Sequence, residues 1–310
     1  MVAIINGFFI VVFIISIIFR IIGGLDKPSY QHANNYKDFN DGTFKNKKGG
    51  AKFKSAENIE ALKKLMVESY YNLEEEIEIR AYFLISVNEV IDILGNKKVF
   101  IFNNSFSCTT LQSYITDINI KVTYTQGFRI FRAILAPILK DKLNPQDIEV
   151  YNKIKSIFNN IVKPEMTDLE KVRAVHDYLI LTSRYDEENY KNNTIPEVSH
   201  TPYGLLFKNK AVCSAYAEVF MIFMTLASIE CYYVVGNIKD TTNSMGHAWN
   251  IIRIKNHYYH IDVTFNNPVP DVIGRVKYDY FNLTDEKIGK THIWNRNEYP
   301  ACIASGAKVY

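Results

Sequence analysis

The chain has 310 residues, of which 47% are hydrophobic, and carries a net charge of +3 at pH 7. This length and apolar content are sufficient for two modest domains, each with a core of its own. The charge is small, and the Tyr and Phe residues are scattered along the chain instead of being grouped beside Lys and Arg, which argues against a nucleic-acid partner.

The first apolar segment, residues 2–22, contains a single charged residue, Arg20. About twenty such residues can cross a bilayer as a helix, and Arg20 can extend its side chain toward the surface from the helix end. No small-x-small cleavage site and no lipoprotein cysteine follow. We therefore expect residues 1–22 to form an uncleaved transmembrane helix that anchors the protein in a membrane.

Residues 23–54 are polar, contain Gly, Asn and Asp throughout, and carry seven Lys against three Asp. Such a segment cannot bury enough apolar area to fold, so we expect a solvated linker. The alternative is that its lysines bind an anionic membrane or a cell-envelope polymer.

Residues 55–145 are expected to form a small α/β support subdomain. Apolar residues at helical spacing predict a helix over 58–71, and alternation with charged residues predicts a strand over 77–85. A capping box and a glycine bound a short helix over 86–95, and a second alternating pattern predicts a strand over 118–124. No residues in this part have catalytic spacing.

Residues 146–310 are expected to form the second domain. Asn144 and Pro145 are typical of the N-cap and first position of a long helix. Thr167 and Glu170 have the spacing of a capping box for the next helix. His176 lies on that helix and is expected to be structural.

Cys213 is predicted to begin a third helix, because apolar residues recur at helical spacing from Ala217 onward. A thiol at a helix N-terminus lies near unpaired N–H groups and the positive end of the helix dipole. Both favour the thiolate, which is the reactive form. A lone cysteine is more often an ordinary buried residue, so its position does not establish a nucleophile.

His247 and Asp262 are predicted to lie on the two strands of a hairpin, over residues 247–254 and 257–265. With a two-residue turn, His247 and Asp262 share one face of the sheet as diagonal neighbours, within about 7 Å. A turn of three residues would place them on opposite faces. His260 shares the face of Asp262 and is the alternative base. We prefer His247, because it lies at a strand start beside a loop, where functional side chains are commonly exposed.

No spacing typical of a metal or cofactor site is present, so we expect neither. The remaining cysteines are Cys108, Cys231 and Cys302, and their spacing indicates no compact disulfide framework. Cys231 lies on an apolar run and is expected in the core. Cys213 is predicted to be a free thiol.

The segment from Met166 to Trp294 resembles the transglutaminase-like superfamily, in its bacterial, extracytoplasmic branch. The resemblance covers somewhat under half of the chain. It rests on several short motifs in the family's order and spacing: 167–172, 176–178, 202–206, 212–213 with 216–217, 246–250, Tyr259 with 262–264, and 280–285.

The resemblance implies an α+β fold with a papain-like core, in which a helix bearing the cysteine packs on an antiparallel sheet bearing the histidine and the aspartate. Cys213, His247 and Asp262 match the family's three catalytic positions. It also implies an extracytoplasmic catalytic domain, although Arg20 and Lys27 after the apolar run would by the positive-inside rule place it in the cytoplasm.

One departure concerns the cysteine motif. The family commonly has glycines two residues before and two residues after the cysteine, where this chain has Ala211 and Ala215. The added methyl groups are expected to narrow the cleft or to change the turn geometry, which affects substrate preference more than the chemistry itself.

From these residues we expect a thiol acyltransferase or amidase that acts on protein or peptide amides through an acyl-enzyme. Transamidation by an amine and hydrolysis by water both remain open. The alternative is a catalytically silent surface module of the same fold that binds peptides or a cell-envelope polymer.

Overall fold

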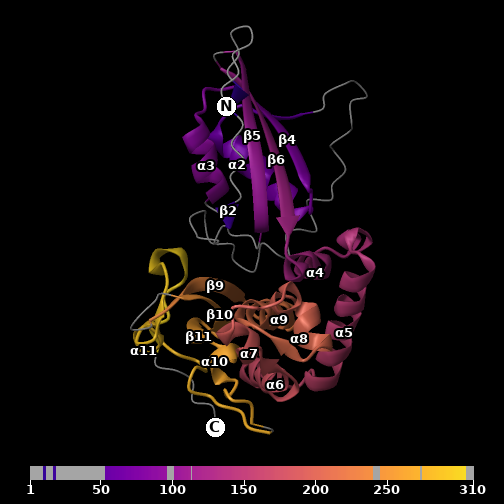
Figure 1. Ribbon diagram of the computed structural model, residues 1–310, viewed down its shortest axis with the longest axis vertical. Helices are drawn as coiled ribbons and strands as arrows, with labels where there is room; N and C mark the ends of the chain where they lie inside the picture. The colour runs from indigo at the N-terminus through magenta and orange to yellow at the C-terminus, as the bar shows by residue number, and fades with distance from the viewer. Residues whose placement is uncertain are drawn as a thin grey trace. The chain divides into compact units, whose positions relative to one another are not determined.

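The computed structural model describes residues 10–11, 17–18, 53–95, 101–112, 114–239, 245–272 and 274–304. The chain divides into two compact units, residues 1–125 and residues 126–310, which are coloured from indigo to magenta and from magenta to yellow in Figure 1. Each unit has its own sheet and helices.

The first unit is built on a sheet with strand order β1-β5-β6-β4-β3, in which β2 also pairs with β5. Strands β3 and β4 are parallel, and the other pairs are antiparallel. Its elements are β1 (Ile10–Val11), β2 (Ile17–Ile18), β3 (Lys54–Ala56), α2 (Ile59–Tyr71), β4 (Glu76–Ala81), α3 (Val87–Gly95), β5 (Ile101–Gln112) and β6 (Ile115–Tyr124).

The local patterns of this unit predict most of its elements. Helix α2 buries Leu62, Met66 and Tyr70 on the expected stripe. The predicted capping box precedes α3, since the backbone N–H of Ser86 donates to a carboxylate oxygen of Glu89 at 2.8 Å and Glu89 N donates to Ser86 Oγ at 3.2 Å. The sequence pattern does not predict β5, because polar residues in its centre interrupt the apolar alternation.

The membrane anchor expected over residues 2–22 is a wrong prediction. Among the residues that the structure describes, no helix is long and apolar enough to cross a membrane. The described parts of that segment, β1 and β2, are strands that pair with β5. These two strands consist of Ile and Val residues, whose branched side chains favour strands. The expected location of the protein, anchored in a membrane with an extracytoplasmic domain, is wrong for the same reason. The rest of this segment and the expected linker up to residue 52 lie outside the described residues.

The second unit carries most of the helices and a four-stranded antiparallel sheet in the order β11-β10-β9-β12. Its helices are α4 (Gln126–Leu135), η2 (Pro137–Lys142), α5 (Pro145–Ile161), α6 (Asp168–Thr182), α7 (Glu187–Lys191), η3 (Glu197–His200), α8 (Pro202–Phe207), α9 (Cys213–Leu226), α10 (Val263–Asn266), α11 (Asp285–Ile288) and η4 (Arg296–Glu298). Its strands are β7 (Arg184–Tyr185), β8 (Lys210–Ala211), β9 (Cys231–Ile238), β10 (Met245–Ile254), β11 (His257–Ile261) and β12 (His292–Ile293).

Helix starts in this unit follow the predicted capping pattern. The side chain of Asn144 caps α5 by accepting from the N–H of Asp147, and Pro145 occupies the first helical position. Thr167 and Glu170 form the predicted capping box of α6. These caps fix the ends of two helices that pack against the centre of the unit.

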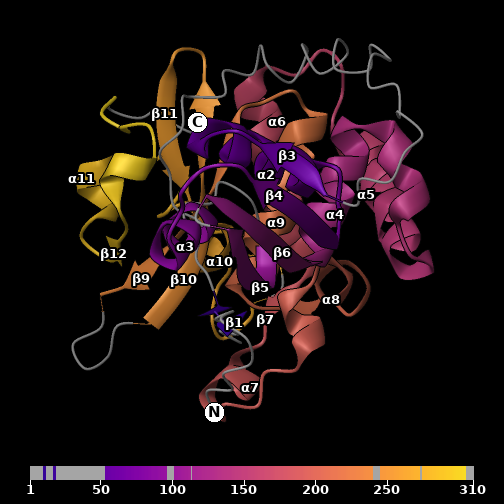
Figure 2. The ribbon, with the colours of Figure 1, turned by 90° about the horizontal axis from the view of Figure 1, so that it is seen from above.

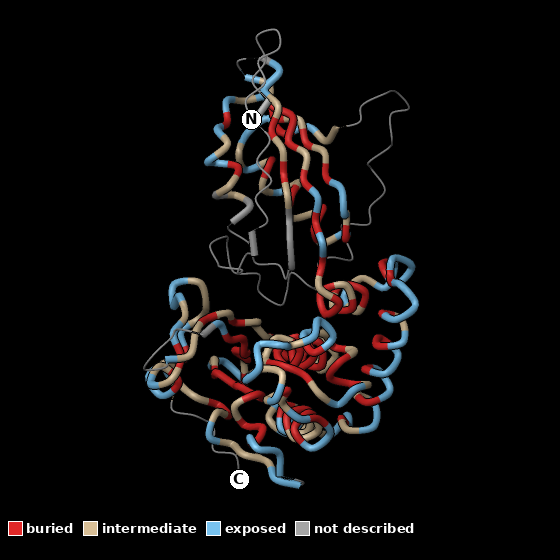
Figure 3. The backbone as a smooth tube through the Cα atoms, viewed as in Figure 1, coloured by how far each residue is buried: buried red, intermediate tan, exposed pale blue. Residues whose placement is uncertain are grey.

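Helix α9 is that centre. All residues from Ala215 to Met224 are buried, and the helix is drawn as an almost entirely red coil in the second unit in Figure 3. Helices α4, α5, α6 and α8 contact it, as do β9 and β10. A helix with apolar side chains on nearly all faces is stable where neighbours cover every face. The mixed α and β content expected from the sequence is confirmed.

The sheet is closed at one edge by the short strand β12, which lies beside β9 (Figure 2). The close approach of β12 to β9 requires a glycine at position 236 on β9. Gly236 pairs with His247 on β10. A Cβ atom on Gly236 would lie 2.2 Å from the carbonyl oxygen of Ile293 and 2.6 Å from Cη2 of Trp249. No side chain fits there unless β12 or the indole ring moves.

We predict that Gly236→Ala destabilises the second unit by about 2 kcal/mol or more, because overpacking must displace backbone or a buried ring. Both tryptophans, Trp249 and Trp294, lie in this unit, so urea unfolding followed by tryptophan fluorescence measures its stability. Gly274→Ala is the contrast, since its Cβ would meet nothing within 4 Å although φ is +77°, and we expect a loss of about 1 kcal/mol. Equal losses in both variants would contradict the packing argument.

Candidate active site

Cys213 is the first residue of α9 and is half-buried. Val212 precedes it in an extended conformation, and the Val212 carbonyl accepts the N–H groups of Ala215 and Tyr216 at 3.1 and 3.4 Å. The N–H groups of Cys213 and Ser214 precede these first hydrogen bonds of the helix, as at any helix start. The thiol therefore lies where the helix dipole favours a negative charge.

Strands β10 and β11 form the hairpin that carries the other two candidate residues, and its register is the predicted one. Residues 255–256 make the two-residue turn, and Ile254 pairs with His257. His247 lies in β10, and Asp262 directly follows the last residue of β11. The strand predicted over 257–265 is too long, because β11 ends at Ile261 and residues 263–266 form α10. The side chains of His247 and Asp262 nevertheless lie within hydrogen-bonding distance of each other.

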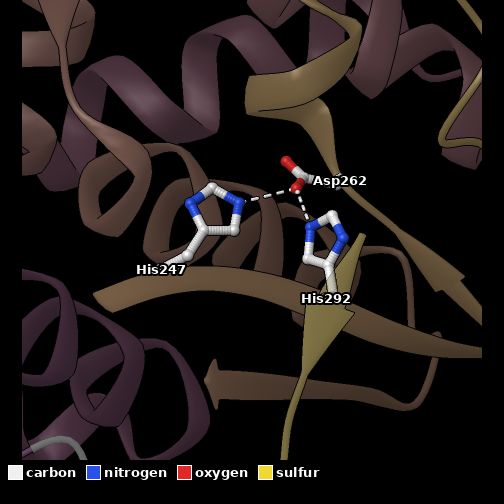
Figure 4. Close-up of side chains that lie close together, drawn as sticks. All are labelled: His247, Asp262 and His292. Carbon is white, nitrogen blue, oxygen red and sulfur yellow. Dashed lines mark hydrogen bonds and ion pairs between the residues drawn. The ribbon is translucent and has the colours of Figure 1, made fainter. Parts of the chain in front are cut away.

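Asp262 is a fully buried carboxylate that caps α10. Its Oδ1 accepts the N–H of Phe265 at 3.0 Å, and its Oδ2 lies 2.6 Å from Nε2 of His247 (Figure 4). A carboxylate can only accept, so Nε2 of His247 carries a hydrogen. The other ring nitrogen, Nδ1, is then the one available to the thiol.

His247 shifts the pKa values of Cys213 and Asp262 toward their charged forms, and these two groups shift the pKa of His247 toward its charged form, whereas the charge of Asp262 opposes ionisation of the thiol. Burial would raise the pKa of the Cys213 thiol, but the charge of His247, its hydrogen bond to the thiol and the N–H of Ala248 lower it below its ordinary value. Burial would lower the pKa of His247, but the charges of Asp262 and Cys213 raise it to about 10. Although burial opposes it, His247 also holds the pKa of Asp262 well below its usual range.

These shifts favour a thiolate at Cys213 opposite an imidazolium at His247, with the Asp262 carboxylate behind it. Such an arrangement can supply a nucleophile, a proton carrier and a group that orients it. The pair exists between the lowered pKa of the thiol and the raised pKa of His247, about 10.

His260, the alternative base, belongs to a different hydrogen-bonded group. Its Nδ1 accepts the indole N–H of Trp249 at 2.9 Å, and its Nε2 lies 2.8 Å from Oδ1 of Asp285. Indole can only donate, so the hydrogen of the neutral ring is on Nε2, directed at Asp285. Both ring nitrogens are engaged, and burial lowers the pKa of His260. This environment does not suit a base for Cys213.

The other sequence-selected residues take structural places. The ring of His176 is buried between Asp177, at 2.8 Å, and Asn266, at 2.9 Å, as expected for a structural histidine. Among the described residues Cys213 is a free thiol, as predicted.

Sequence patterns miss two residues of the site. His292, on β12, places Nε2 3.0 Å from Oδ2 of Asp262. Tyr185, on β7, lies near enough to Cys213 that the thiolate charge adds to burial in raising the pKa of its phenol. Each lies on a strand of two residues, which is too short to show periodicity. A histidine beside strand formers is the one local signal for His292.

Two groups of described residues bring three potential metal-ligand atoms within 4.8 Å of one another: His247 with Asp262 and His292, and His260 with Asp285 and Cys302. In both groups imidazole nitrogens already face a carboxylate oxygen at hydrogen-bonding distance. In the second group a metal on Nε2 of His260 would have to displace the hydrogen that the Trp249 contact places there. Hydrogen bonds between the imidazole rings and the carboxylates therefore account for the short distances in both groups.

Residues 155–263, which include all three candidate residues, match the model of the transglutaminase-like superfamily. The kyphoscoliosis peptidase of Mus musculus is 23% identical over 132 residues, which are 40% of this chain and 20% of that protein. The kyphoscoliosis peptidase of Homo sapiens is 24% identical over 128 residues, or 39% and 19%. The chain thus spans about one fifth of the length of these relatives. The crystal structure of a TGase covers 73% of this chain and 62% of its own, with 15% identity and a TM-score of 0.37.

We predict that the rate of alkylation of Cys213 by iodoacetamide begins to fall at a lower pH than that of an ordinary thiol, which loses about ten-fold per pH unit below its pKa. The reason is that His247 lowers the pKa of Cys213 and keeps its own proton up to about pH 10. The modified peptide is quantified by mass spectrometry, which separates Cys213 from the other cysteines.

His247→Ala removes the imidazolium, so the rate should fall and regain the pH dependence of an ordinary thiol. His260→Ala is the matched control, because His260 is also buried beside a carboxylate but is held by Trp249 and Asp285. A pH profile that is still displaced to low pH in His247→Ala would show that another group stabilises the thiolate.

Proposed function

We propose that this chain, which carries a transglutaminase-like domain over residues 155–263, is a cysteine-dependent acyltransferase or hydrolase that acts on protein or peptide amides. The observation that carries the proposal is the 2.6 Å hydrogen bond between His247 and the buried Asp262, on a hairpin packed against the helix that begins with Cys213. The three residues provide a nucleophile, its proton carrier and an orienting group.

In the first half-reaction the thiolate of Cys213 attacks the carbonyl carbon of a substrate amide. A C–S bond forms, and the carbonyl becomes a tetrahedral oxyanion. His247 then donates its proton to the leaving nitrogen, so that the C–N bond breaks and an amine or ammonia departs. The product on the protein is a thioester at Cys213, and His247 is left neutral with its proton on Nε2.

In the second half-reaction the neutral Nδ1 of His247 takes a proton from an attacking water or amine, which adds to the thioester carbonyl. The C–S bond breaks, and the thiolate and imidazolium are restored. Water gives a carboxylic acid, and an amine gives a new amide. Asp262 keeps Nε2 protonated throughout, so Nδ1 remains the nitrogen that exchanges the proton.

The start of α9 supplies a place for the oxyanion. The N–H groups of Cys213 and Ser214 lie before the ladder that begins with Ala215, where a helix leaves donors for other partners. Each donor aimed at a developing oxyanion contributes about 3 kcal/mol to catalysis. Nucleophile and donors therefore come from the same helical turn.

The alanines that stand at the family's glycine positions leave this chemistry in place. Ala211 and Ala215 are both fully buried among the core residues around α9. Their methyl groups therefore pack in the core. This placement does not support the expectation that they narrow the cleft, and it gives them a role in anchoring the residues on either side of Cys213.

The name of the two relatives, kyphoscoliosis peptidase, supports peptide bonds as the substrate and water as the acceptor. We propose proteins or peptides as the substrate class on this ground and on the chemistry of the site. Binding to a cell-envelope polymer stays a prediction from the sequence.

We predict that Cys213→Ala lowers turnover at least about 10³-fold while the protein stays folded, because no other group replaces the nucleophile. Peptides bearing side-chain and backbone amides are incubated with the full chain and a fluorescent primary amine. Amine incorporation indicates transamidation, and release of ammonia or of a shorter peptide indicates hydrolysis. Cys231→Ala is the control, since burial raises the pKa of that thiol.

Full activity in Cys213→Ala would remove the proposal. No turnover with either protein, together with equal peptide binding by both, would favour the silent binding module.

A further inference from the structure

One carboxylate oxygen of the site has two histidine partners. Oδ2 of Asp262 lies 2.6 Å from Nε2 of His247 and 3.0 Å from Nε2 of His292, and Figure 4 shows both rings directed at it. All three residues are buried. Because the carboxylate can only accept, His292 must also donate from Nε2. Asp262 thus receives three N–H groups, including that of Phe265 on Oδ1.

The ring of His292 is fixed by contacts that are independent of Asp262. Its Nδ1 lies 2.8 Å from the hydroxyl of Thr291. Its face and edges meet Trp249, Phe265 and Tyr280, with ring centroids 4.8, 4.9 and 5.5 Å apart. A ring held on all sides presents its Nε2–H at one place.

The backbone that carries His292 is placed equally closely. β12 pairs with β9 through His292 opposite Ile238 and Ile293 opposite Asn237. The neighbouring residue on β9 is Gly236, whose missing side chain admits both the Ile293 carbonyl and the ring of Trp249. Gly236 also pairs with His247 on β10. The two histidines that share Asp262 are therefore linked through one strand, β9.

We propose that His292 is a positioning residue, which holds Oδ2 of Asp262 in place by hydrogen bonding and thereby orients His247 toward Cys213. The inference rests on the proposed function, since it concerns the assembly of the same site. His292 lies outside the segment that matches the family model, which ends at residue 263.

The physical reason is the freedom that Asp262 would otherwise have. The Phe265 N–H fixes Oδ1 and leaves rotation of the carboxylate about that bond. With His247 as the sole partner of Oδ2, both side chains could turn together and keep their hydrogen bond while Nδ1 swings away from the thiol. A third donor from a separate strand removes that motion.

The test compares His292→Leu, which removes the donor, with His292→Gln, whose amide carries an N–H at a similar reach. The readout is the alkylation rate of Cys213 against pH in the full chain. We expect His292→Leu to lower the rate about ten-fold at and below neutral pH, as for loss of a hydrogen bond to a charged group. His292→Gln should recover the rate to within about three-fold.

A double-mutant cycle separates positioning from a general loss of packing. If His292 acts through Asp262, His292→Leu adds nothing to the effect of Asp262→Asn. His260→Leu and His260→Gln form the matched pair, since both ring nitrogens of the buried His260 are engaged by Trp249 and Asp285. Additive effects of His292→Leu and Asp262→Asn, or no recovery in a folded His292→Gln, would overturn the inference.

Histidine ring ¹⁵N spectra of the same proteins give a readout that needs no reactive thiol. We expect the Nε2 resonances of both His247 and His292 to move in Asp262→Asn, and that of His247 to move in His292→Leu. An unmoved His247 resonance in His292→Leu overturns the inference even if the enzyme is active. If Cys213 instead reacts as an ordinary thiol while these resonances move as expected, the proposed function fails and the positioning role holds.

Discussion

The site depends on a negative charge that the fold keeps out of water. Removing a carboxylate from water costs several kcal/mol unless hydrogen bonds and an opposite charge compensate it. Asp262 receives three N–H donors, and its charge in turn favours the imidazolium at His247, which favours the thiolate at Cys213. Negative, positive and negative groups alternate along this line, so loss of any one member alters the charge state of the others.

The topology explains why these groups meet. Helix α9 is buried on nearly every face, and its first residue is therefore held against the sheet by the whole core. The β10–β11 hairpin delivers His247 and Asp262 on one face, and the order β11-β10-β9-β12 brings the last strand back to the same carboxylate. The proposed base and its orienting group are thus set on rigid elements, as catalytic geometry requires.

Local sequence patterns were sufficient where the cause of the structure is local. Helix caps such as Thr167 with Glu170 follow from neighbouring residues, and the two-residue turn at 255–256 fixes the register of the hairpin. His292 could not be found in this way, because its role comes from strand pairing across the sheet. The apolar run at residues 2–22 misled because Ile and Val suit a membrane helix and a strand equally by hydropathy, and only the partner, β5, distinguishes them.

The position of β12 after Cys213 and the β10–β11 hairpin in the chain has a consequence for biosynthesis. A ribosome releases Cys213 and the hairpin before His292, so a nascent chain holds the proposed nucleophile without the complete set of donors around Asp262. Thiols are oxidised most readily as thiolates. If His292 acts as inferred, Cys213 reaches its full thiolate character only when β12 pairs with β9. Until then the sulfur atom of Cys213 in the growing chain is less readily oxidised.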